Sequence, residues 1–259
     1  MSEPIKFNIE NQIARVTFNR PEQHNAISYN GWLKLIEIVN KIEEDSSIRS
    51  VVFSGGGEKA FSAGADIKDF ETHRKDSKTA KTYSTAFDGA LDAIEALSVP
   101  TISMIRGICV GGGCELSMAT DIRIASNKSR FGIPVAKLGI LVGYREMKRL
   151  VNLVGPGNAS YILLSGRLID SAEAFRMGLI TQLVEDSELE DTVLNLANEI
   201  TPLAPLSQKR HKIILQNVIS NQSLDGLDQE LPYTNFDSAD FQEGKEAFIS
   251  RRPPNFKGR

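Results

Sequence analysis

The stretch that decides the fold is GICVGGGCELSMATD, residues 107–121. An apolar, strand-like sequence ends here in three glycines, Gly111 to Gly113, and a helical sequence with Glu115 near its start follows at once. The first amides of a helix have no acceptor within the helix, and glycine lets another group approach the backbone closely. The stretch therefore predicts a strand–turn–helix unit with a carboxylate in the first helical turn.

A second glycine turn, FSAGADIK at residues 61–68, has the same setting between a strand and a helix. Two such helix N-termini facing each other would surround one carbonyl oxygen with amide donors and stabilise the negative charge that it gains in a reaction. Glu115 would then lie near the reacting carbon as a general acid or base. Alternatively, Glu115 only complements the positive end of the helix. The residues alone leave both interpretations open.

Strands and helices alternate in the first half of the chain. Residues 5–18 predict two short strands around a polar turn, and the order up to residue 126 is β-β-α-β-α-β-α-β, with 101–110 as one strand. Such alternation favours parallel pairing in an α/β fold. The charged residues 69–82 predict a mobile segment, and 69–88 are expected to shape a substrate pocket. Beyond residue 145 the pattern is helical, with one late strand at 180–185.

The composition is that of an ordinary globular protein. The 259 residues are 41% hydrophobic and 24% charged, with a net charge of −3, which argues against a nucleic-acid partner. No apolar run approaches the length of a membrane span and the N-terminus has no signal core, so no membrane association is expected. Two cysteines, Cys109 and Cys114, have no ligand partners at metal-binding spacing. We expect no metal site and a reducing, cytoplasmic location.

Motifs for other chemistries are weak or missing. The stretch from Gly55 to Ala60 has dinucleotide-fingerprint spacing, but another glycine loop follows it instead of an apolar helix. Neither a phosphate loop nor a G-x-S-x-G nucleophile elbow is present. No nicotinamide or flavin cofactor is therefore expected.

Two blocks, AFSAGADIKDF (60–70) and IRGICVGGGCELSMATDIRIAS (105–126), resemble the crotonase superfamily, the enoyl-CoA hydratase/isomerase family. Three further blocks are similar to it in the same order: ARVTFNRPEQHNAIS (14–28), LSGRLIDSAEAFRMGLITQLVE (164–185) and DFQEGKEAFISRRPPNF (240–256). The resemblance implies an α/β spiral of ββα units over 1–195 and a helical trimerisation region over 196–259. It also implies a homotrimer or a dimer of trimers.

The resemblance also implies roles for individual residues. The amides of Ala65 and Gly112 match the family's oxyanion hole, and Glu115 matches one of two catalytic glutamates of the hydratases. The substrate-binding turn, which contacts the acyl-CoA, matches Asp66, Ile67 and Lys68. The substrate is then an acyl-CoA thioester, and coenzyme A arrives as part of it, so that neither a metal nor a redox cofactor is required.

The chain departs from the hydratase pattern at two places. The block FGxPE is replaced by FGIPVAKLGI (131–140), which puts Val135 where the second glutamate is usual, and PGxGGTQRL is replaced by VGYREMKRL (142–150). Glu115 could act alone, or Tyr144 or Glu146 could supply the second group. An enoyl-CoA hydratase-like lyase is the main prediction. The alternatives are an enoyl-CoA isomerase, an acyl-CoA decarboxylase, or a binding protein without turnover.

Overall fold

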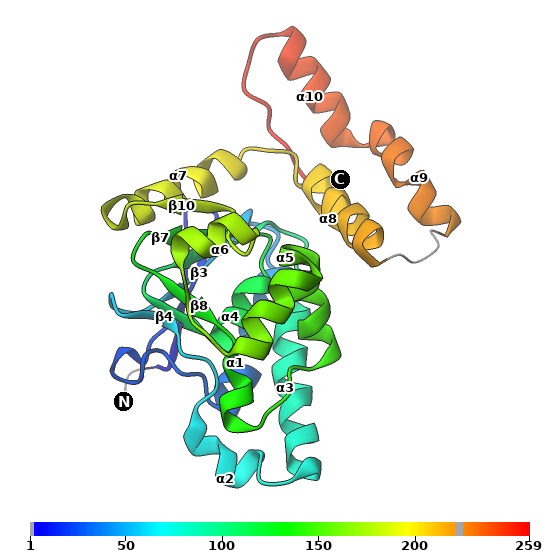
Figure 1. The fold of residues 1–259 in the computed structure, drawn as a ribbon. Coiled ribbons are helices and arrows are strands. Elements are labelled where there is room, and N and C mark those ends of the chain that lie inside the picture. Colours follow the sequence, from blue (N-terminus) through cyan, green and yellow to red (C-terminus); the bar gives the residue numbers. More distant parts are fainter. Residues whose placement is uncertain (1–2, 221–224) are drawn as a thin grey trace.

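Two β-sheets and the helices packed around them form the body of the protein (Figure 1). The computed structural model describes residues 3–220 and 225–259. Within these residues the larger sheet has six strands, in the order β1-β2-β3-β5-β7-β10, and the smaller has four, β4-β6-β8-β9. The bounds are β1 Ile5–Glu10, β2 Ile13–Phe18, β3 Ser50–Gly55, β4 Ala60–Ser62, β5 Thr101–Ile105, β6 Ile108–Val110, β7 Ile122–Ser126, β8 Arg130–Gly132, β9 Ile169–Asp170 and β10 Gln182–Val184.

The chain enters the two sheets alternately, and this makes the fold a spiral. β3, β5 and β7 lie parallel in the larger sheet, while β4, β6 and β8 lie parallel and in the same order in the smaller one. Helices follow β4 and β6, so each ββα turn stacks on the previous turn. This confirms the α/β spiral that the resemblance implied.

The strand predicted over 101–110 is in fact two strands, β5 and β6, that belong to different sheets. The chain bends between them at Gly107, whose φ is 69°. A Cβ at Gly107 would lie 2.1 Å from the carbonyl oxygen of Lys59, so only glycine allows this close approach. Similarly, β4 lies in a stretch that was predicted to be loop. The predicted N-terminal hairpin and the late strand, β10, are confirmed.

The helices of the body are α1 Tyr29–Glu44, α2 Phe70–His73, α3 Ser77–Ala96, α4 Gly112–Met118, α5 Tyr144–Ser165, α6 Ser171–Met177 and α7 Leu189–Ile200. The segment 69–82, predicted to be mobile, is helical: α2 and the first turns of α3 occupy most of it. Asp76 and Thr79 form a capping box that starts α3. The indole of Trp32 on α1 then donates a hydrogen bond of 2.7 Å to the Tyr83 hydroxyl, which fixes α3 against α1.

Three C-terminal helices extend away from the body (Figure 1): α8 Pro205–Ser220, α9 Gly226–Thr234 and α10 Ala239–Ile249. α8 is held to the body by Lys212, whose Nζ lies 2.6 Å from the Asp121 carboxylate. Many large apolar side chains are exposed along this arm: Leu215, Val218, Ile219, Leu227, Tyr233, Phe236, Phe248 and Ile249. In the part of the chain that the structure describes, no helix has the length and apolarity needed to cross a membrane.

Candidate active site

The three glycines at the N-terminus of α4 each have a different structural role. Gly111 turns the chain with φ 51° and ψ −131°, and its amide donates to the Gly132 carbonyl at 2.8 Å. A Cβ on Gly113 would lie 2.3 Å from the Ser62 carbonyl oxygen, so α4 packs directly on the backbone of β4. Gly112 lies between them and faces a cavity. The glycine run therefore brings the start of α4 against the other glycine turn.

The amides of Ala65 and Gly112 lie side by side. The backbone of Ile27 pairs with the Ala65 turn. Its carbonyl accepts from the Asp66 amide at 2.9 Å, and its amide donates to the Gly64 carbonyl at 2.8 Å. The Ala65 amide between them therefore points away from Ile27. The position of a Cβ on Gly112 is 3.4 Å from the Ala65 nitrogen. Among residues 3–220 and 225–259, no acceptor takes a hydrogen bond from either amide. The pair is therefore free to bind an oxygen.

The residues after Ala65 form the mouth of the site. Asp66 is buried and accepts hydrogen bonds from Arg20, at 2.8 Å, and from the Lys68 amide, at 3.1 Å. Ile67 is 63% exposed. A second, more open cavity lies on this side of the turn, lined by Gln23, Ala26, Ala63, Ala65, Asp66, Ile67, Lys68 and Glu71. The expected substrate-binding turn thus borders an open cavity.

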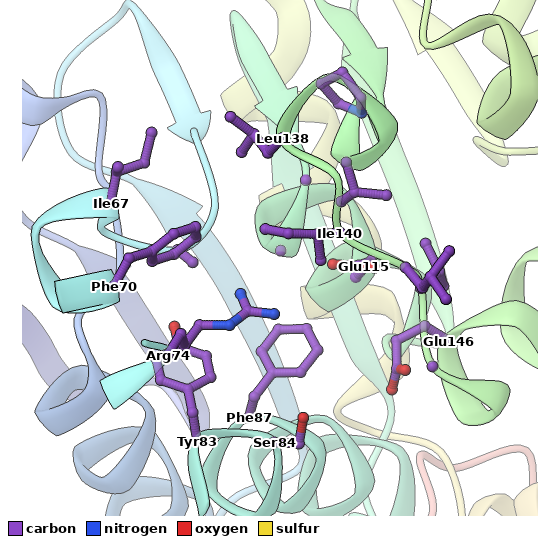
Figure 2. A pocket seen from close by; sticks show the side chains of 18 of the residues that line it. Ile67, Phe70, Arg74, Tyr83, Ser84, Phe87, Glu115, Leu138, Ile140 and Glu146 are labelled. Atoms are coloured by element: carbon purple, nitrogen blue, oxygen red, sulfur yellow. The ribbon is translucent and has the colours of Figure 1, made fainter. Parts of the chain in front are cut away.

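The main cavity, of about 320 Å³, lies on the other side of the Ala65 amide (Figure 2). Its walls come from the Ala65 turn, α2, α3, the start of α4 and the segment 134–146. Most of the lining is apolar, and it includes Phe70, Tyr83, Phe87, Val110, Val135, Leu138, Ile140, Leu141 and Val142. Residues of the segment 69–88 supply one wall, as the sequence predicted.

Glu115 is buried and lines this cavity. Burial is the main cause that raises its pKa to about 8, and the negative charge of Glu146 adds to the effect, while Arg74 opposes it. In the described structure its carboxyl group caps no amide of the first turn of α4. The position favours a proton-exchanging group in the cavity over a residue that only complements the helix terminus.

A second carboxyl group in the cavity belongs to Glu146, in the first turn of α5. Its side chain is 3% exposed, and a Cβ on Gly143 would lie 2.4 Å from its Oε2, so the carboxylate folds back over that glycine. Its Oε1 lies 3.5 Å from Nη1 of Arg149 without a hydrogen-bond partner. The carboxyl groups of Glu146 and of Asp88 on α3 line the same cavity and influence each other's pKa. Burial raises the pKa of both carboxyl groups, and their proximity favours one shared proton.

Tyr144 is 97% exposed and does not line the cavity, which argues against it as the replacement for the missing glutamate. Val135, at the position where the resemblance places the second hydratase glutamate, lines the cavity. Sequence reasoning missed Asp88 and Arg74. The signal for Asp88 was available in the sequence, because it shares one face of α3 with three other residues that line the cavity: Tyr83, Ser84 and Phe87.

Comparisons with known proteins agree with this geometry. The family model described as enoyl-CoA hydratase/isomerase matches residues 8–259. The chain belongs to the enoyl-CoA hydratase/isomerase family. It is similar to the short-chain-enoyl-CoA hydratase of Clostridium acetobutylicum, with 35% identity over 96% of both chains. The crotonyl-CoA hydratase of Syntrophomonas wolfei is 31% identical over 98% of both chains.

A solved structure supports the same assignment. The enoyl-CoA hydratase/carnithine racemase from Magnetospirillum magneticum has a TM-score of 0.96 and 35% identity, over 100% of this chain and 97% of that one. Family membership makes this protein a hydratase-like enzyme with an acyl-CoA thioester substrate. The resemblance inferred from the sequence is therefore confirmed over essentially the whole chain.

Proposed function

We propose that this family member catalyses the reversible addition of water to a short 2-enoyl-CoA. One observation carries the proposal: the two unpaired amides and two buried carboxyl groups, Glu115 and Glu146, border a single cavity of about 320 Å³. The thioester oxygen would accept hydrogen bonds from Ala65 and Gly112. The turn at Asp66, Ile67 and Lys68 would bind the coenzyme A side. The names of the two relatives, which specify short-chain and crotonyl substrates, support a short acyl group.

The protonation states suggest which carboxyl group donates and which accepts a proton during hydration. Glu115, with a pKa of about 8, enters mostly protonated at neutral pH. The Asp88–Glu146 pair would share one proton and one negative charge, so that the pair can accept a proton from water. The water oxygen bonds to C3, the C2=C3 electrons move to the thioester oxygen as an enolate, and Glu115 protonates C2. Proton exchange with solvent then restores both groups.

The second candidate, isomerisation or decarboxylation, is favoured by one observation. Val135 makes the cavity wall apolar where the resemblance places a glutamate in the hydratases. An isomerase needs one carboxyl group that moves a proton between C4 and C2, which Glu115 alone could do. A decarboxylase needs only the amide pair to hold the enolate. A binding protein without turnover is disfavoured because it has no use for two buried carboxyl groups.

A substrate panel tests these alternatives. Purified protein is incubated with crotonyl-CoA, 3-butenoyl-CoA and malonyl-CoA, and the products are identified by mass spectrometry. The proposal expects 3-hydroxybutyryl-CoA from crotonyl-CoA, with one deuterium at C2 in heavy water. Conversion of 3-butenoyl-CoA without any hydration, or loss of CO₂ from malonyl-CoA alone, would reject it in favour of the corresponding alternative.

Two variants test the role of Glu146. Glu146→Gln should lower kcat for hydration by about 10²–10⁴-fold, because a general acid or base contributes an effect of that size. Adding Val135→Glu to that variant places a carboxyl group on the same cavity wall and should restore part of the activity. Full activity in Glu146→Gln would remove Glu146 from the mechanism.

We also propose a homotrimer, or a dimer of trimers, assembled through residues 196–259. The apolar side chains exposed along the arm support this, because large exposed apolar surfaces mark interaction sites. Light scattering on the purified protein tests it, and a monomeric mass would contradict it. The two free cysteines support a reducing, cytoplasmic location. The proposed reaction is redox-neutral, and residues of the chain supply all its acid–base steps, so it requires no added cofactor.

A further inference from the structure

Arg74 is the one cationic side chain in the described lining of the main cavity. It follows α2, and its guanidinium lies 4.9 Å from the centre of the Phe70 ring and 4.8 Å from that of the Tyr83 ring. Figure 2 shows the guanidinium projecting into the cavity beside Phe87. Stacking on the two rings holds the guanidinium in place, so the positive charge has a defined position in the cavity wall.

No carboxylate of the described chain pairs with Arg74. Asp76, two residues away in sequence, accepts from the Thr79 amide at the start of α3. Asp66 pairs with Arg20, and Asp69 accepts from the Tyr29 amide. Of the acidic groups that line the cavity, Glu146 lies 3.5 Å from Arg149, and Asp88 interacts with Glu146 and with the charges of Arg145 and Arg149. The remaining one, Glu115, is mostly protonated at neutral pH because burial raises its pKa to about 8.

An unpaired cation beside an apolar wall is unfavourable unless something compensates for the water that it loses. Guanidinium groups bind carboxylates through two parallel hydrogen bonds, and such charge-assisted bonds are stronger than neutral ones. A carboxylate supplied by the bound molecule would complete the interactions of Arg74. The free enzyme leaves this position open to a ligand.

The position of Arg74 indicates which part of the substrate it meets. The two cavities share Ala63, Ala65 and Ile67, so they join at the amide that would hold the thioester oxygen. Coenzyme A would occupy the open cavity beside Lys68, and the acyl group the cavity with Glu115 and Arg74. Arg74 and Glu115 line the same cavity, so the guanidinium borders the space that the acyl group would occupy.

We propose that Arg74 binds a carboxylate on the acyl group, so that the preferred substrate is a short 2-enoyl-CoA with a second acid group near C3. The proposal rests on the proposed function for the orientation of the thioester. It adds the chemical class of the substrate, a monothioester of an unsaturated dicarboxylic acid. A neutral enoyl group of equal length would leave the half-buried guanidinium without a carboxylate partner.

Kinetics with two matched thioesters test this specificity. Glutaconyl-CoA carries a carboxylate one methylene beyond C3, and pent-2-enoyl-CoA is its neutral counterpart. A site group that pairs with one substrate and is left without a partner by another favours the first, and we expect kcat/KM to be at least about 100-fold higher for glutaconyl-CoA. Arg74→Met should bring that ratio close to one, and Arg74→Lys should restore part of it. Lys75→Met, which removes an exposed neighbouring charge, should leave the ratio unchanged.

Binding of saturated thioesters separates this inference from the proposed reaction. Calorimetry with glutaryl-CoA and pentanoyl-CoA needs no turnover, so the preference and its loss in Arg74→Met can be measured even if neither enoyl thioester is hydrated. If Arg74 only adjusts the charge of Glu115, Arg74→Met changes the affinity for both thioesters by the same factor. An unchanged ratio in that variant, or a wild-type preference for the neutral thioesters, would overturn the proposal.

Discussion

Replacing Glu115 by glutamine should lower activity and raise stability together. Glutamine keeps the shape of the protonated glutamate but exchanges no proton. We expect kcat for crotonyl-CoA hydration to fall by about 10²–10⁴-fold, the usual contribution of a general acid or base, with little change in KM. The same substitution removes a carboxyl group whose ionisation the folded protein opposes.

The size of the stability effect follows from the pKa of Glu115. Burial first, and then the charge of Glu146, raise it from an ordinary 4.5 to about 8. Between these values the folded protein holds a proton that the unfolded chain has released, so the free energy of unfolding falls as the pH rises. At pH 7 the interval above 4.5 is 2.5 units, which at about 1.36 kcal/mol per unit gives a loss of about 3 kcal/mol. The glutamine variant avoids this loss.

Urea unfolding at pH 5, 6, 7 and 8 measures the effect, at one protein concentration because assembly also changes apparent stability. The variant should gain about 1.4 kcal/mol per pH unit over wild type, levelling off above pH 8. Glu173→Gln is the matched control, because Glu173 also lies in the first turn of a seven-residue helix, with 28% of its side chain exposed. If the Glu115 variant and wild type show the same pH dependence, Glu115 ionises normally and the reasoning fails.

Three further substitutions have expected outcomes. Gly112→Ala places a methyl group 3.4 Å from the Ala65 nitrogen and should lower kcat/KM for crotonyl-CoA by about 10²–10³-fold; retained activity would contradict the oxyanion hole. Asp66→Asn removes the partner of Arg20 at 2.8 Å, so titration should show weaker acyl-CoA binding and kinetics a higher KM with kcat less affected. Tyr144→Phe should leave steady-state kinetics unchanged because Tyr144 is 97% exposed. A large loss of activity would instead indicate that Tyr144 takes part in catalysis.

The segment 131–150, where the chain departs from the hydratase pattern, shows a limit of prediction from sequence. The sequence identified Val135 as a departure and offered Tyr144 and Glu146 as replacements. These two residues are two positions apart on α5, and at about 100° per residue they lie on nearly opposite sides of the helix. Only one could face the cavity, and the packing of α5 on the body buries Glu146 and exposes Tyr144. That choice depends on contacts between distant segments.

The sequence by itself determined the two glycine turns and the position of Glu115, because each is set by consecutive residues: glycines where the backbone must turn or approach closely, and a helix directly after them. It also determined the family. Only the tertiary structure brought Asp88 to Glu146 and left Arg74 unpaired beside the acyl cavity. These features depend on burial and on charges that distant elements contribute, and no local pattern contains either.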